Sequence, residues 1–260
     1  MEFEHLILTI DAPLARIELN RPAKRNALSP ELLVELAQAA HELDGHDEVT
    51  AVVVAGAGQS FCAGADLAAF TSDPSADPRA RADLGRQMAE AVTKMRAVTV
   101  AAIQGRCVGG GVVLAAACDM RVAAHDAVFS IPELDLGIPL AWGGVPRLTR
   151  ELGPALAKEL IITCRPFDAD EAHRARFVNR LADDADAEAT ALARDVATRS
   201  AATLRITKAA VDAAAEQLVA TTGSEKDADL LASVLGDEES GEVRRRYLEG
   251  LAARRAQSAT

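Results

Sequence analysis

A single glutamate, Glu133, stands where a carboxyl group could transfer protons. It follows Pro132 in the run Ile131-Pro-Glu-Leu-Asp-Leu-Gly-Ile-Pro139, whose other members are mostly apolar residues, glycine and proline. A carboxyl group among such neighbours is poorly solvated, which tunes it for general acid–base chemistry. The alternative is a solvated loop acid, and Asp135 is either a partner of Glu133 or a residue of that kind.

Two glycine-rich segments could supply backbone N–H groups to a ligand. The first is Gly56-Ala-Gly58, continuing to Phe61-Cys-Ala-Gly-Ala-Asp66, and the second is Gly105-Arg-Cys-Val-Gly-Gly-Gly111. Glycine permits close backbone approach and positive φ, so the two turns could direct two N–H groups at one oxygen as an oxyanion hole. Tight turns and close helix–strand packing would explain the same glycines. A dinucleotide fingerprint is disfavoured, because its third glycine would fall at Phe61.

The other polar residues favour structural roles. Asp66 and Asp119 are predicted to be turn or capping residues. Cys62 lies in the first glycine-rich segment, but no base pairs with it in the sequence pattern, so a nucleophile is not expected there. The five histidines are scattered without ligand spacing, and no metal site is expected.

The elements that would position these segments alternate between strands and helices up to about residue 130. Ser29 is expected to cap a helix that has Pro30 at its first position. Residues 71–78, rich in Pro, Asp and Ser, are expected to form a mobile loop, and the chain from Pro154 onward reads as almost entirely helical. The predicted strands span residues 6–10, 15–19, 51–55, 98–103, 119–123 and 127–130, and the predicted helices include residues 112–117, 185–200, 204–219 and 243–256. This alternation predicts a layered α/β core over residues 1–200, followed by a helical C-terminal portion over 201–260.

The composition narrows the class of protein. With 260 residues, 49% of them hydrophobic, the chain can bury a sizeable core. A net charge of −11 argues against nucleic acid or an anionic membrane as the main partner. Four cysteines without C-x-x-C spacing and an N-terminus without signal-peptide character indicate a cytoplasmic protein.

Four motifs in series resemble the enoyl-CoA hydratase/isomerase (crotonase) family. They occur in family order and near family spacing: Asn20-Arg-Pro-x-x-x-Asn-Ala-Leu28, Phe61-Cys-Ala-Gly-Ala-Asp66, Gly105 to Asp119 with the glycine triplet, and Pro132-Glu133 to Arg147-Leu148. The resemblance implies a crotonase-type spiral of ββα units, with C-terminal helices that assemble trimers or hexamers. It also implies an acyl-CoA thioester as substrate, so that coenzyme A enters with the substrate and no separate cofactor is needed.

The resemblance also assigns roles to positions in this chain. Glu133 is the expected catalytic acid or base, and the N–H groups of Ala65 and Gly110 are expected to form the oxyanion hole for the thioester carbonyl. Arg21, Lys24 and Arg25 would offer positive charge to the phosphates of coenzyme A, unless they form an ordinary solvated loop. The positions expected to line the substrate path are Lys24, Arg25, Ala27, Ala63, Asp66, Leu67, Val113, Pro132, Ala141 and Trp142.

Departures from the family pattern bear on the reaction. Hydratases of the family place a first glutamate where this chain has Val113, and dienoyl-CoA isomerases place aspartates at the positions of Val113 and Ala141. A lysine of the family's phosphate grip is replaced by Ala68. The single glutamate that remains favours double-bond isomerisation over hydration, because one base can move a proton from C2 to C4. Weak hydration, a non-catalytic acyl-CoA binder, and another reaction such as thioester hydrolysis stay open.

Overall fold

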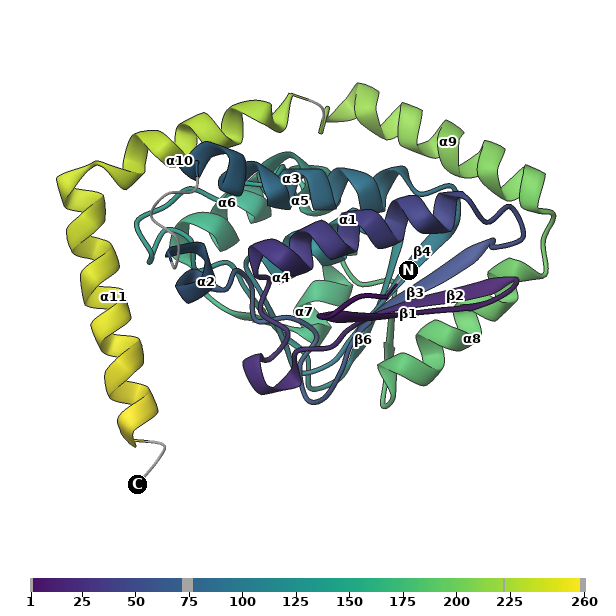
Figure 1. Ribbon diagram of the computed structural model, residues 1–260, viewed down its shortest axis with the longest axis horizontal. Coiled ribbons are helices and arrows are strands. Elements are labelled where there is room, and N and C mark those ends of the chain that lie inside the picture. The colour runs from purple at the N-terminus through teal and green to yellow at the C-terminus, as the bar shows by residue number, and fades with distance from the viewer. Residues whose placement is uncertain (1, 72–76, 222, 258–260) are drawn as a thin grey trace.

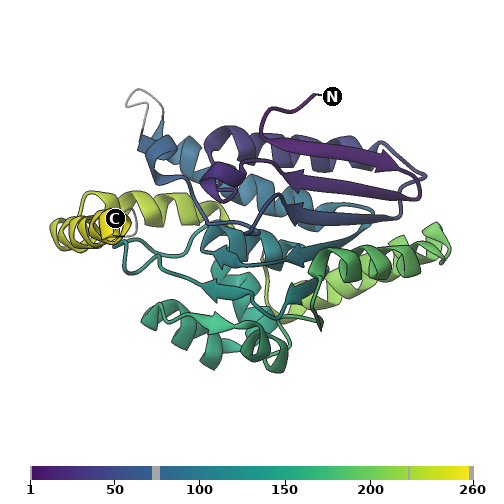
Figure 2. The same cartoon turned by 90° about the horizontal axis from the view of Figure 1, so that it is seen from below.

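The protein is described here by a computed structural model that covers residues 2–71, 77–221 and 223–257. Among these residues, six strands form the main sheet in the order β1-β2-β3-β4-β6-β9, and three form a second sheet in the order β5-β7-β8. The strands of the main sheet are β1 Leu6–Asp11, β2 Leu14–Leu19, β3 Ala51–Gly56, β4 Val98–Ile103, β6 Met120–Ala124 and β9 Arg180–Ala182. Figure 2 shows the strands following one another from the purple N-terminal hairpin to the teal strands.

The N-terminal hairpin is confirmed, and the rest of the main sheet is parallel. Strand β1 pairs antiparallel with β2, with Leu6 opposite Leu19, whereas β2, β3, β4, β6 and β9 pair parallel in turn. All six residues of β3 are buried. A strand buried on both faces is typical of a parallel sheet covered by helices on each side.

The two faces of the sheet are covered by different helices. Alternate residues of β3 face opposite sides, so that Val53 packs with the cluster that includes Ala189 of α8 (Ala185–Ala197), while Val52 joins the larger core. That core also contains residues of α1 (Pro30–Asp44), α3 (Pro78–Lys94) and α4 (Gly110–Ala117). Figure 1 shows α1 and α3 on one side of the sheet and α8 on the other.

A local sequence signal explains where α1 begins. Ser29 caps α1 as predicted, because its hydroxyl accepts a hydrogen bond from the N–H of Leu32 and Pro30 follows it.

The remaining strands are β5 Arg106–Val108, β7 Val128–Ser130 and β8 Phe167–Asp168. The short helices are η1 Pro22–Lys24, α2 Leu67–Thr71, α7 Ala169–Arg174 and η2 Ser224–Lys226. The longer helices are α5 Gly144–Leu152, α6 Pro154–Thr163, α9 Ala201–Leu218, α10 Asp227–Leu235 and α11 Glu238–Gln257. Most of the predicted loop over 71–78 lies outside the described residues.

The prediction of an almost entirely helical chain after Pro154 is wrong in one respect. Strands β8 and β9 interrupt the helices, and β9 extends the main sheet by pairing Val122 of β6 with Arg180. Two or three residues are too few to show an alternating pattern, so pairing with a strand already in place determines these elements. Strand β5 was missed for the same reason.

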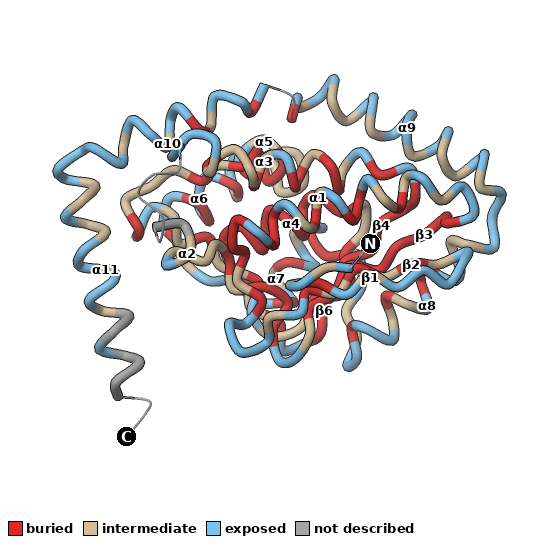
Figure 3. Tube along the Cα trace, in the orientation of Figure 1, coloured by how far each residue is buried: buried red, intermediate tan, exposed pale blue. Residues whose placement is uncertain are grey.

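The C-terminal helices lie outside the sheet and its covering layers. Helix α9 begins at Ala201 and buries none of its residues, whereas α10 packs against α3. Figure 3 shows the buried residues concentrated in the sheet, α1, α3 and α4, while α9 and α11 are mostly exposed or partly exposed. None of the described helices is both long and apolar enough to cross a bilayer.

Candidate active site

The two glycine-rich segments lie against each other beyond the carboxyl ends of β3 and β4. The N–H of Cys62 donates to the carbonyl of Arg106 at 3.0 Å, and the N–H of Val108 donates to the carbonyl of Cys62 at 2.9 Å. A Cβ on Gly64 would lie 2.8 Å from the carbonyl oxygen of Val108 and 3.7 Å from the nitrogen of Gly110. Glycine at position 64, with φ of 87°, therefore allows the two turns to approach this closely.

Ala65 and Gly110 present N–H groups at this junction. Within the part of the chain that the structure describes, neither N–H donates to a backbone or side-chain oxygen. Gly110 is the first residue of α4, so its N–H also lies at the positive end of the helix dipole. Two N–H groups that need an acceptor, one of them at a helix N-terminus, suit an oxyanion hole.

The carboxyl group of Glu133 lies directly over the start of α4. A Cβ on Gly109, the residue that caps the helix, would collide with Oε1 of Glu133 and lie 3.3 Å from its Cδ. Oε2 of Glu133 is buried and has no hydrogen-bond partner among the described residues. Burial raises the pKa of Glu133 from 4.5 to about 7, an effect that a backbone hydrogen bond partly opposes. Such a carboxyl group is suited to exchanging a proton near neutral pH.

Two apolar side chains, Val113 and Trp142, lie within or against the first turns of α4. Val113 is fully buried one turn into α4, and its Cγ2 would stand 2.9 Å from a Cβ on Gly144. The indole of Trp142 lies against Gly110, whose Cβ would stand 3.1 Å from Cε3, and against Gly85 of α3. Ala141 packs against the same core, and Pro132 is partly exposed beside Glu133.

The residues predicted to line the coenzyme A path differ in exposure and in their contacts. The guanidinium of Arg21 pairs with Asp66 at 2.9 Å and also donates to the carbonyl of Ala27. Lys24 and Arg25 are exposed, while Ala27, Ala63 and Leu67 are partly exposed. Arg21 is therefore occupied within the fold, and Lys24 and Arg25 are the exposed cations of this loop.

Asp66 has the capping role that the sequence predicts. One carboxylate oxygen accepts the N–H of Ala69 at 3.3 Å, and the other accepts a hydrogen bond from Arg21. Burial raises the pKa of Asp66, but the hydrogen bonds from Arg21 and Ala69 and the charge of Arg21 outweigh it, so that the pKa lies below its usual value.

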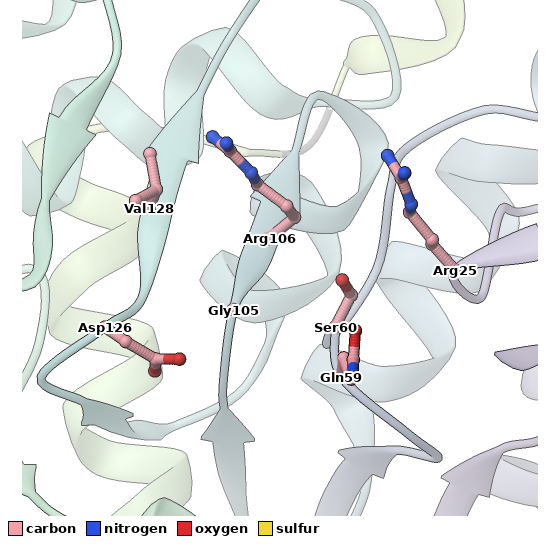
Figure 4. Close-up of a pocket in the computed structure, with 7 residues that line it drawn as sticks. All are labelled: Arg25, Gln59, Ser60, Gly105, Arg106, Asp126 and Val128. Atoms are coloured by element: carbon pink, nitrogen blue, oxygen red, sulfur yellow. The ribbon is translucent and has the colours of Figure 1, made fainter. Parts of the chain in front are cut away.

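A cavity of about 380 Å³ beside this loop is lined by two arginines that come from different segments. Arg25 and Arg106 extend to the same side of it, with Asp126 at the opposite end (Figure 4). Gln59, Ser60, Gly105 and Val128 complete its lining. The sequence motif contains Arg106, but spacing alone did not single it out, because only the fold brings it next to Arg25.

Asn26 is a second residue whose importance the sequence did not reveal. Its side chain is fully buried, and its amide nitrogen donates to the carbonyls of Ala57, Ser60 and Phe61 at 2.8–3.2 Å. It thereby ties the loop of residues 21–27 to the first glycine-rich segment. The asparagine was part of the recognised motif, which was the only available signal.

Two other polar residues, Asp119 and Cys62, have surroundings that fit a structural role. Asp119 accepts hydrogen bonds from Thr99 and from Lys208 at 2.7 Å. Burial raises the pKa of Cys62 to about 12, so its thiol stays protonated at neutral pH. No cluster of three or more metal-ligating side chains occurs in residues 2–71, 77–221 and 223–257.

Comparisons with known proteins point to one family. Residues 9–257 match the family model described as enoyl-CoA hydratase/isomerase. A Mycobacterium bovis protein named as a probable enoyl-CoA hydratase, echA8, is 38% identical over 218 residues, covering 83% of this chain and 84% of the relative. An Arabidopsis thaliana protein named peroxisomal Delta(3,5)-Delta(2,4)-dienoyl-CoA isomerase is 36% identical over 183 residues, or 66% of each chain.

The fold is shared with solved structures as well. The crystal structure of an enoyl-CoA hydratase/isomerase from Xanthobacter autotrophicus superposes with a TM-score of 0.86 at 32% identity, covering 98% of this chain and 99% of the other. The expected crotonase-type α/β fold with a helical C-terminal portion is thus confirmed. On the match over residues 9–257 and these likenesses, the chain belongs to the enoyl-CoA hydratase/isomerase family.

Proposed function

We propose that the protein is an enoyl-CoA isomerase in which Glu133 is the sole acid–base residue. The observation that carries this proposal is the buried, unpartnered Oε2 of Glu133, combined with a fully buried valine at position 113. Hydration needs one group to hold and activate water while a proton reaches Cα, a task that two carboxyl groups share readily. The apolar side chain of Val113 supplies neither function.

The proposed reaction moves a double bond without adding atoms. Carboxylate Glu133 takes a proton from C2 of a 3-enoyl-CoA, and the electrons of that C–H bond delocalise into the thioester as a dienolate. The N–H groups of Ala65 and Gly110 hold the enolate oxygen, where the negative charge develops. Protonated Glu133 then returns the proton to C4, which leaves the double bond between C2 and C3 and regenerates the carboxylate. The balance requires no cofactor beyond the coenzyme A of the substrate.

We further propose that Arg25 and Arg106 bind phosphate groups of coenzyme A. Both arginines line one cavity and are exposed. In a chain with a net charge of −11, such a local pair gives an anionic ligand a place to bind. Lys24, exposed in the same loop, adds to the positive charge.

Exposed apolar residues on α9 support the proposal that the C-terminal portion assembles trimers or hexamers. Val211 and Leu218, two turns apart, are 61% and 82% exposed. Burying such a face against a second copy would be favourable. Light scattering of the purified protein should give a mass of three or six chains, and Val211→Asp should reduce it. A monomeric wild-type protein would contradict this proposal.

The product of the reaction distinguishes the candidate functions. The purified protein should be incubated separately with trans-3-hexenoyl-CoA and trans-2-hexenoyl-CoA, and the products resolved by chromatography and mass spectrometry. An isomerase converts the 3-enoyl substrate into the 2-enoyl product without a change of mass. Addition of water to the 2-enoyl substrate would identify a hydratase, and release of free coenzyme A would indicate thioester hydrolysis. No conversion despite binding would favour a non-catalytic acyl-CoA binder.

A further inference from the structure

The turn that carries Trp142 has an unusual backbone. Trp142 and Gly143 both have positive φ, at 63° and 68°. A bulky side chain rarely adopts this conformation, so the surrounding contacts must hold it. The turn leads into α5, and its position sets where the indole lies against Gly110.

Two charged residues bind the peptide groups of this turn. Arg147, only 1% exposed, donates to the carbonyl of Gly143 at 3.1 Å and to that of Trp142 at 3.5 Å. In addition, Oδ2 of Asp227 accepts the N–H of Gly143 at 2.7 Å. The conformation of the turn is thus held by hydrogen bonds to charged groups, which are stronger than those between neutral groups.

Asp227 reaches this turn from the C-terminal portion. It is the first residue of α10, 84 positions along the chain from Gly143. Ser224, in the preceding η2, packs beside the same glycine, since its Oγ would lie 3.0 Å from a Cβ there. Burial raises the pKa of Asp227, while the hydrogen bond from Gly143 and the charge of Arg147 oppose that rise. A half-buried carboxylate is costly unless it is hydrogen-bonded, and here the bond goes to the turn.

We propose that Asp227 is a positioning residue: by holding the N–H of Gly143 it keeps the indole of Trp142 against Gly110, at the mouth of the oxyanion hole. The C-terminal portion would in this way set the shape of the acyl pocket. The position of the indole does not depend on which reaction is catalysed. Its consequence for turnover rests on the proposed function.

The sequence supplies a direct probe, because Trp142 is the only tryptophan. Its fluorescence emission and its quenching by acrylamide report the environment of the indole without any substrate. Asp227→Ala removes the acceptor for the Gly143 N–H. Asp227→Asn keeps an oxygen in place but removes the charge. Asp227→Leu keeps the branching at Cγ without an acceptor, and serves if the alanine variant does not fold.

Asp229→Ala is the matched control. Asp229 lies in the first turn of the same helix, is 58% exposed in its side chain, and pairs with Arg79 of α3 at 2.6 Å, whereas Asp227 bonds to Gly143. Both aspartates stabilise the N-terminus of α10 through the helix dipole. A general weakening of the helix would therefore affect both variants, whereas loss of the turn contact affects only the Asp227 variants.

The expected result is an emission shift to longer wavelength and a several-fold increase in the quenching constant for Asp227→Ala or Asp227→Leu. Asp227→Asn should restore values close to those of the wild type, and Asp229→Ala should match the wild type. With 3-hexenoyl-CoA, the acceptor-free variants should lose about 10- to 100-fold in kcat, because small displacements in a catalytic site are costly. Unchanged fluorescence in both acceptor-free variants, or equal changes in Asp229→Ala, would overturn the positioning role. If fluorescence responds as expected but the wild type converts no enoyl-CoA, the positioning role stands and the proposed function fails.

Discussion

The carboxyl group of Glu133 occupies the space that a side chain on Gly109 would need. Gly109 has φ of 51° and caps α4, so its missing side chain serves both the turn and the placement of the carboxyl group above it. The position of the Glu133 carboxyl group thus depends on the glycine at the start of α4.

Gly109→Ala should separate Glu133 from the oxyanion hole. The new methyl group would push Oε1 away, and the positive φ would add strain of about 1–3 kcal/mol. We expect kcat to fall by about 100-fold, since even small misplacement of a catalytic group is costly. Gly153→Ala is the control: φ is 74° there, but nothing lies within 4 Å of its Cβ position, so this variant should lose stability without losing activity. Equal activity in the two variants would show that Gly109 does not position Glu133.

The rate should depend on pH through Glu133. Proton abstraction requires the carboxylate, and burial raises the pKa of this group to about 7. kcat/KM for a 3-enoyl-CoA should therefore rise as pH increases through about 7 and level off above it. A profile that is flat between pH 5 and about 8, or that falls as pH rises through 7, would contradict the assignment of Glu133 as the base.

The same pKa shift should make Glu133 destabilising at high pH. Its folded-state pKa, about 7, lies above the ordinary value of 4.5, so the folded state holds the proton more tightly than the unfolded state does. The contribution of Glu133 to the free energy of unfolding should thus fall between pH 4.5 and about 7, by about 3 kcal/mol. Glu133→Gln should accordingly raise the Tm at pH 8 and change it little at pH 4.5. A lower Tm at pH 8 would contradict this expectation, because it would mean that the folded protein stabilises the charged form of Glu133.

Val113→Glu should introduce hydration. Val113 is fully buried in α4, at the position where the resemblance places the first glutamate of hydratases, so the variant tests whether a second carboxyl group there supports hydration. We expect the ratio of hydrated product to isomerised product to increase, at a cost of about 2–4 kcal/mol in stability from burying a carboxyl group. Val113→Gln, which cannot exchange a proton in this way, should pay the stability cost without gaining hydration. An unchanged ratio of hydrated to isomerised product in Val113→Glu would contradict the argument that Val113 disfavours hydration.

Arg106→Ala should weaken binding of coenzyme A thioesters. Loss of one arginine from the cavity removes a charge-assisted contact to phosphate, so KM should increase by about tenfold and the effect of salt on KM should decrease. Asp126→Asn should change KM in the opposite direction. It removes a negative charge from the same cavity and should therefore lower KM. If neither variant changes KM, the phosphates bind elsewhere.

The sequence predicted the elements whose signals are local. The Ser29 cap, the N-terminal hairpin and the buried strand at residues 51–55 all follow from short patterns, and the structure confirms them. Strands β5, β8 and β9 escaped prediction because each is defined by its partner strand, not by its own pattern.

The same distinction between local signals and distant contacts applies to the candidate active site. Glu133 was identified from its apolar neighbours and from the family motif, and its buried carboxyl oxygen fits the role. The pairing of Arg25 with Arg106 in one cavity and the contact between Asp227 and Gly143 join distant parts of the chain. Such contacts depend on how the layers pack, which a single sequence does not encode in any local spacing.

The most direct test compares the wild type with Glu133→Gln on trans-3-hexenoyl-CoA. The account predicts that the glutamine variant loses about 10²- to 10⁴-fold in kcat, the usual contribution of a general base, while it binds the 2-enoyl-CoA product with an affinity close to that of the wild type. Turnover by Glu133→Gln at the wild-type rate would contradict the central claim that Glu133 carries the proton.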